Sequence, residues 1–192
     1  MDLSEIDDSN IIVTIDPTDF EYDGEPKEPG VTVTVNGGTI TNLYGGNDAS
    51  GKPNGNISVY INDGNITNTF GGGEKTAANT TNIYLNGGTS DYIYGGSNQS
   101  GTVGTTKIIT TGGKSLAIYG GNNQGGTTNL TNVTINGGEI TDVYGGGEKT
   151  SVLTSTNINL NSQAVNVFGG SNVSGDVPVS NINVNNGTAT NM

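Results

Sequence analysis

Short runs in which apolar and polar residues alternate recur along most of the chain. Each run places two residues on one side with a single residue between them on the other, and most runs end at a turn rich in asparagine and glycine. Alternation over four or five residues between such turns is typical of a strand with one buried face. The two expected inward positions of successive runs are Val33 and Val35, Val59 and Ile61, Ile83 and Leu85, Ile108 and Thr110, Val133 and Ile135, Ile158 and Leu160, and Ile182 and Val184.

A second short strand is expected after each of these turns. It ends at an aromatic residue followed by two glycines, and successive aromatic residues lie 24 to 26 positions apart. A repeat of about 25 residues is too small to bury an apolar face alone, so neighbouring repeats must stack and share a core. The aromatic residues are Tyr44, Phe70, Tyr94, Tyr119, Tyr144 and Phe168.

This repeat predicts an all-β fold, a right-handed parallel β-helix of about seven coils. Residues 30–192 would form the coils, with equivalent positions stacked about 4.8 Å apart. Stacked asparagines such as Asn132, Asn157 and Asn181 are expected to hydrogen-bond along the axis. A β-propeller is the main competing fold, but its blades usually need about 40 residues or more. A calcium-binding β-roll would need aspartates at fixed positions, which the glycine pairs lack.

A longer period is superimposed on the coils. The sequence GGGEKT at 71–76 returns at 145–150, and two other glycine turns also return after 74 or 75 residues. Duplication of a block of three coils explains this period. The functional alternative is that the two Glu-Lys turns, at 74–75 and 148–149, form two equivalent ligand sites.

Charge separates the first 29 residues from the rest of the chain. The net charge of the protein is −12, of which ten acidic residues and one lysine give −9 over residues 1–28. Eight acidic residues and five lysines leave only −3 from Pro29 onward. Residues 1–29 are therefore predicted to form an acidic tail and cap, with a strand at 11–15, that covers the end of the first coil.

Missing residue types exclude several classes of function. The chain has no cysteine and no histidine, and all six of its basic residues are lysines. Zinc fingers, thiol nucleophiles and Ser-His-Asp triads therefore cannot be built. An acidic chain without arginine is a poor partner for nucleic acid. The sequence predicts no metal site, no cofactor and no segment inserted in a membrane.

Two stretches resemble parts of bacterial surface proteins. The Asn-Gly-Gly turns, as at 36–38, and the Tyr-Gly-Gly-Gly turn at 144–147 make the coils similar to the β-helix repeats of bacterial cell-surface and adhesin-like proteins. Residues 12–35, above all FEYDGEPK at 20–27 and PGVTV at 29–33, resemble the first strands of bacterial immunoglobulin-like surface repeats. The resemblance implies an extracellular or cell-surface protein that takes part in adhesion or carbohydrate recognition.

The expected function is that of a non-catalytic cell-surface module, adhesin-like or glycan-binding, whose partner is a polysaccharide or a host or cell-surface glycan. Neither a signal peptide nor an anchor is recognisable, which predicts a piece of a longer exported polypeptide with flanking domains. One alternative is a polysaccharide-active enzyme domain, pectin lyase-like or a glycoside hydrolase, suggested by the fold alone. The second alternative is a structural spacer in a larger surface protein.

The candidate ligand-binding residues are three tyrosines and an aspartate on adjacent coils. Tyr60 and Tyr84 lie on an outward face, and Tyr92 follows Asp91 in the next strand. We expect these four residues to form one aromatic patch for a ligand. The column of aromatic residues described above is expected either to support the coils by stacking or to bind sugars along its length.

An enzyme would need acidic residues gathered in one place. Asp91 and Asp142 lie two coils apart, so their levels differ by about 10 Å. That separation overlaps the range of inverting glycosidases, but no residue in the sequence is paired with them, and no catalytic residue is assigned. The enzyme hypothesis requires Asp91, Glu139 and Asp142 to lie in one groove with a lysine within hydrogen-bond reach.

Overall fold

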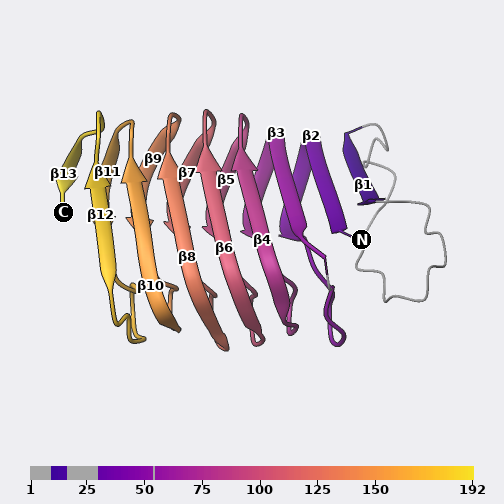
Figure 1. Ribbon diagram of the computed structural model, residues 1–192. Coiled ribbons are helices and arrows are strands. Elements are labelled where there is room, and N and C mark those ends of the chain that lie inside the picture. Colours follow the sequence, from indigo (N-terminus) through magenta and orange to yellow (C-terminus); the bar gives the residue numbers. More distant parts are fainter. Residues whose placement is uncertain (1–9, 17–29, 54) are drawn as a thin grey trace.

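The computed structural model describes residues 10–16, 30–53 and 55–192, and these form a β-solenoid (Figure 1). The coils follow one another from β2 at one end to β12 and β13 at the other, and no helix occurs among the described residues. This part of the chain accordingly contains no helix that could cross a membrane. The all-β fold of stacked parallel coils, which the repeat predicted, is confirmed.

The described residues contain thirteen strands. They are β1 (Ile11–Asp16), β2 (Gly30–Tyr44), β3 (Ile57–Phe70), β4 (Ala78–Leu85), β5 (Thr89–Tyr94), β6 (Thr102–Thr110), β7 (Lys114–Tyr119), β8 (Thr127–Ile135), β9 (Glu139–Tyr144), β10 (Ser151–Leu160), β11 (Ala164–Phe168), β12 (Ser180–Val184) and β13 (Ala189–Asn191).

The parallel strands form two faces. Face A holds the first halves of β2 and β3, then β4, β6, β8, β10 and β12, and face B holds their second halves, then β5, β7, β9, β11 and β13. Each face therefore has seven strand segments, which correspond to about six complete turns. We number the coils 1 to 7 by one face A residue from each, and these residues pair in register: Val31, Ile57, Thr81, Thr106, Thr131, Thr156 and Ser180.

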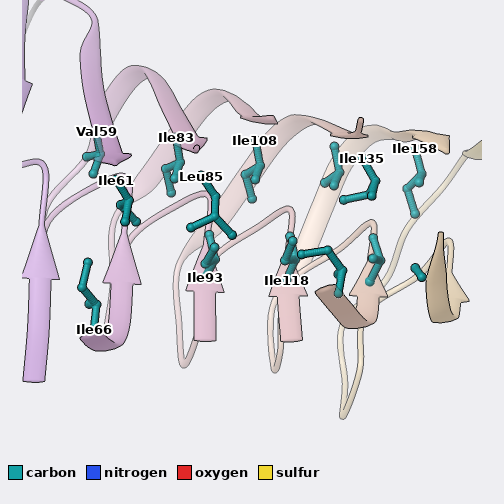
Figure 2. Close-up of a cluster of buried hydrophobic side chains, with 14 of the residues drawn as sticks. Val59, Ile61, Ile66, Ile83, Leu85, Ile93, Ile108, Ile118, Ile135 and Ile158 are labelled. Carbon is teal, nitrogen blue, oxygen red and sulfur yellow. The ribbon is translucent and has the colours of Figure 1, made fainter. Parts of the chain in front are cut away.

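The core lies between the two faces. Figure 2 shows side chains of face A, such as Ile83 and Ile108, pointing toward side chains of face B, such as Ile93 and Ile118. All four are fully buried, and complete burial of such a side chain contributes about 1.5–3 kcal/mol. The inward pairs predicted from the alternation are buried in coils 1 to 6, whereas Val184 of coil 7, the last coil of the described stack, is 44% exposed.

A column of threonines closes the core beside the apolar side chains. At equivalent positions of face A in coils 3 to 6, four threonines are fully buried: Thr81, Thr106, Thr131 and Thr156. Each hydroxyl donates a hydrogen bond of 2.5–2.6 Å to the carbonyl of the glycine that follows face B in the same coil. That glycine cannot carry a side chain, since a Cβ at Gly95 would lie 2.2 Å from the Gly120 oxygen of the next coil.

Strand β1 adds an antiparallel strand to face A. It pairs with the first half of β2 from Ile11 opposite Val35 to Asp16 opposite Gly30, which confirms the strand predicted at 11–15. The rest of the predicted acidic cap, at 1–9 and 17–29, lies outside the described residues. So does FEYDGEPK at 20–27, on which the immunoglobulin-like resemblance depends. The cap therefore stays a prediction.

Candidate functional site

Tyr60 and Tyr84 stack on one another on the outer side of face A. They are register partners in β3 and β4, with ring centroids 4.6 Å apart and ring planes within 7°. The same column continues through Thr34 to Ile12 of β1 on one side and to Ile109 on the other. The two tyrosines thus belong to a short apolar stripe, and each covers one ring face of the other.

Asp91 and Tyr92 lie on face B, on the other side of the core. Both belong to β5, where Tyr92 is paired in register with Asn68 and Ala117 and is 37% exposed. The turn at 86–88 separates β5 from β4, which carries Tyr84. The single aromatic patch expected from the sequence is therefore not formed, because Tyr60 and Tyr84 lie together on one face while Asp91 and Tyr92 lie on the other.

The aromatic column lies outside the main core as a continuous stack. Successive centroids from Tyr44 to Phe168 are 4.8–5.1 Å apart, and the ring planes are within 14° of one another. Phe70, Tyr94 and Tyr119 are almost fully buried, while Phe168 at the end of the stack is 41% exposed. Each aromatic pair of this kind contributes about 0.5–1.5 kcal/mol beyond its buried area. The stack therefore supports the coils, and its central rings are not accessible to a sugar.

Loop residues two coils further along hold the tyrosine hydroxyls. The amide of Asn98 donates to the Tyr44 hydroxyl (3.3 Å), and the Tyr94 hydroxyl donates to the carboxylate of Glu148 (2.9 Å). Burial, with the Glu74 carboxylate as the next cause, raises the pKa of Tyr44 to about 12. Burial and the Glu148 carboxylate likewise raise the pKa of Tyr94. These hydroxyls are part of the packing between loops and coils.

The two Glu-Lys turns are engaged in internal contacts. Glu74 accepts hydrogen bonds from the side chains of Asn98 (2.9 Å) and Gln99. Burial alone would raise the pKa of Glu74, but the hydrogen bonds from Tyr44, Asn98 and Gln99 outweigh it and lower that pKa. Glu148 accepts from Tyr94 as described. A hollow of about 520 Å³ does lie beside Glu74 and Tyr44, but the carboxylate itself is already satisfied by the protein. These contacts favour duplication over paired ligand sites.

A groove with a volume of about 540 Å³ lies on the outer side of face B. In each coil from 3 to 7, two outward residues form its walls, and the residue between them points inward. Ser115 and Ile140, for example, are buried between their exposed neighbours. One wall consists of Thr89, Lys114, Glu139, Gln163 and Thr188, and the other consists of Asp91, Leu116, Thr141, Val165 and Thr190.

The groove contains one ion pair. The Nζ atom of Lys114 lies 2.8 Å from Oε2 of Glu139 on the next coil, and the two side chains are 60% and 71% exposed. A second hollow, of about 490 Å³, crosses the glycine turns of coils 2 to 5 and shares Thr89, Lys114 and Glu139 with the groove. The ion pair thus stands between two adjoining hollows and is open to water from both.

The enzyme hypothesis requires Asp91, Glu139 and Asp142 to lie in one groove with a lysine, and the structure meets this requirement only in part. Asp91, Glu139 and a lysine do line one groove. Asp142 does not, and its Oδ1 accepts a hydrogen bond of 2.6 Å from Asn166. The exposure of the Lys114–Glu139 pair differs from the enclosed, water-poor surroundings in which catalytic carboxylates usually act. Within the described residues, no three acidic side chains are gathered so that they could hold a metal ion.

The groove was not found from the sequence, although one signal pointed to it. The residues directly after the turn glycines at 88, 113 and 138 are Thr89, Lys114 and Glu139, which stack in register. Opposite charges at equivalent positions of neighbouring coils predict an ion pair between those coils.

Comparison of the chain with protein-family models, with curated proteins and with solved structures gave no match.

Proposed function

We propose that this chain is a non-catalytic glycan-binding module that holds an extended polysaccharide along the groove of face B. The observation that carries the proposal is the groove itself, which crosses coils 3 to 7 and receives one side chain per wall from each coil. Because the coils repeat about every 4.8 Å, the walls present a regular series of contacts to a polymer that also repeats. The proposal includes export to the cell surface within a longer polypeptide, which the likeness of the coils to bacterial surface repeats supports.

The chemistry of the walls suits a sugar chain. Threonine hydroxyls and the amide of Gln163 offer donors and acceptors, while Leu116 and Val165, 52% and 45% exposed, offer apolar contacts to the C–H faces of sugar rings. Binding sites of this kind combine apolar lining with a few polar groups that fix orientation. Tyr60 and Tyr84 are the second choice for a glycan contact, because stacking already covers one face of each ring.

A glycan array followed by calorimetry with the best oligosaccharide tests the groove. The change Leu116→Arg introduces a long charged side chain into the wall and is expected to weaken binding about tenfold or more. Leu153→Arg is the matched control, since Leu153 is 53% exposed but lies outside the groove. Tyr60→Ala and Tyr84→Ala test the other face. Full binding by the Leu116 variant would remove the groove from consideration.

The enzyme alternative is favoured by one observation, the presence of Asp91 beside the Lys114–Glu139 pair in the groove. Incubation of the protein with the oligosaccharides that it binds, followed by chromatography of the products, separates the two functions. Shortened oligosaccharides that disappear in the Glu139→Gln variant would establish the enzyme. A folded protein that neither binds nor cleaves any glycan would be a spacer.

A further inference from the structure

The groove of face B carries more negative than positive charge. Its walls hold the carboxylates of Asp91 and Glu139 and the ammonium of Lys114, and the adjoining hollow adds Asp63. Lys114 is within 2.8 Å of Glu139 and is thereby neutralised. The Asp63 carboxylate accepts a hydrogen bond from the Gly64 backbone. The carboxylate of Asp91 has no hydrogen-bond or ion-pair partner among the described side chains.

The charge is confined to one end of the groove. Asp91, Lys114 and Glu139 belong to coils 3, 4 and 5, and the walls of coils 6 and 7 consist only of uncharged residues. Apolar side chains contribute to that uncharged end, as Val165 is 45% exposed there. A ligand that fills the whole groove therefore meets an unpaired carboxylate near one end and neutral, partly apolar walls near the other.

We infer that the groove selects glycans that bear amino groups, such as partly N-acetylated polymers of amino sugars, and rejects glycans that bear carboxylates or sulfates. This inference rests on the proposed function. An ammonium group on the ligand would pair with Asp91 at coil 3, and uncharged acetamido and hydroxyl groups would lie along coils 6 and 7. An anionic glycan in the groove would meet Asp91 and would have to compete with Glu139 for Lys114, the one cation in the described walls.

The size of the preference follows from the exposure of the groove. Ion pairs open to water are worth little, so one ammonium at Asp91 is expected to improve binding about two- to fivefold. At 1 M ionic strength the Debye length is about 3 Å, so salt screens an exposed ion pair strongly. The preference for the amine should therefore vanish in 1 M NaCl. Hydrogen bonds and apolar contacts along coils 6 and 7 should persist at that salt concentration.

The test measures dissociation constants for three hexasaccharides: glucosamine, N-acetylglucosamine and galacturonic acid oligomers. The protein is expected to bind the glucosamine hexamer about threefold tighter than the acetylated one at low salt, and the galacturonate hexamer most weakly. Asp91→Asn should abolish the preference for the amine. The matched control Asp176→Asn removes the same charge from an exposed position outside the groove and should retain the preference.

The outcomes separate the two proposals. Binding of these glycans without an amine preference, or an unchanged preference in the Asp91 variant, would overturn the inference and leave glycan binding intact. Equal or tighter binding of galacturonate would overturn it as well. If no neutral, amino-bearing or anionic glycan binds, the proposed function itself fails.

Discussion

At the scale of single residues, the loops and the aromatic stack are joined by a repeating contact. A loop side chain of one coil meets the ring hydroxyl two coils earlier, as Asn172 does with Tyr119 at 3.4 Å. Asn98 with Tyr44 and Glu148 with Tyr94 follow the same rule. By that rule the loop residue of coil 4, Asn123, should meet coil 2, where Phe70 offers no hydroxyl.

The missing hydroxyl leaves a buried polar atom without a partner. Asn123 is 8% exposed, and its Nδ2 donates to Oδ1 of Asn98 at 2.7 Å. Its own Oδ1 is the one buried side-chain nitrogen or oxygen of the described residues that has no hydrogen bond. Leaving a buried acceptor unsatisfied costs about 1–3 kcal/mol.

The change Phe70→Tyr should therefore stabilise the protein. The new hydroxyl would donate to Oδ1 of Asn123, and we expect the free energy of unfolding to rise by about 1 kcal/mol in urea titrations. Phe168→Tyr is the matched control, because its ring is 41% exposed and its hydroxyl would be hydrated, with an effect below about 0.5 kcal/mol. An unchanged or lower stability of the Phe70 variant contradicts the two-coil rule.

At the scale of strands, the sequence was most informative where a residue has only two possible orientations. Alternation by two assigned the inward residues of face A correctly through coil 6, because a strand has two sides and only one is apolar. It gave no hint that Thr81 and Thr106 are buried, since an isolated threonine next to an apolar pair is equally common on a surface. Their burial follows from the carbonyls of Gly95 and Gly120 that they satisfy, and these glycines follow a face B strand of the same coil.

The relation between strands was harder to predict. Tyr84 and Tyr92 are eight positions apart, and the turn between them, where Gly88 has a φ of 63°, sends the chain from face A to face B. Proximity in sequence therefore suggested a shared patch that the turn prevents. The groove escaped prediction for a similar reason, because its walls come from five different coils and only the stacking register places them in line.

The buried threonine hydroxyls make face A and the glycine turn of each coil depend on one another. Removal of one hydroxyl by Thr106→Val leaves the buried carbonyl of Gly120 without its 2.6 Å hydrogen bond. We expect a loss of about 1–3 kcal/mol in the free energy of unfolding, measured by urea denaturation. Thr102→Val on the exposed part of β6 is the control and should change stability by less than about 0.5 kcal/mol. Similar values for the two variants would show that the hydroxyl contributes little.

At the scale of the whole molecule, the coils interact mainly with their immediate neighbours, and the loops reach one coil further. The three-coil period of the sequence reappears in these contacts. Thr76 donates to the Asn47 carbonyl and Thr150 to the Asn122 carbonyl, both at 3.0 Å. Asn98 bonds to Tyr44 as Asn172 bonds to Tyr119. Positions 44 and 119 are therefore structurally equivalent, and so are the turns that follow them.

This equivalence predicts that three coils can be removed without loss of the fold. Deletion of residues 45–119 joins Tyr44 to Gly120, so that Asn172 meets Tyr44 where it now meets Tyr119. Four stacked coils remain, above the roughly three repeats that a solenoid needs. Because a shorter solenoid exposes less surface on unfolding, its urea m-value should fall to about three fifths of the full-length value, with a strand-rich circular dichroism spectrum retained.

Deletion of residues 45–114 removes almost the same length but joins two face B strands in tandem, and it should not fold. If both deletions fold equally well, the register of the coils is not what holds the solenoid together.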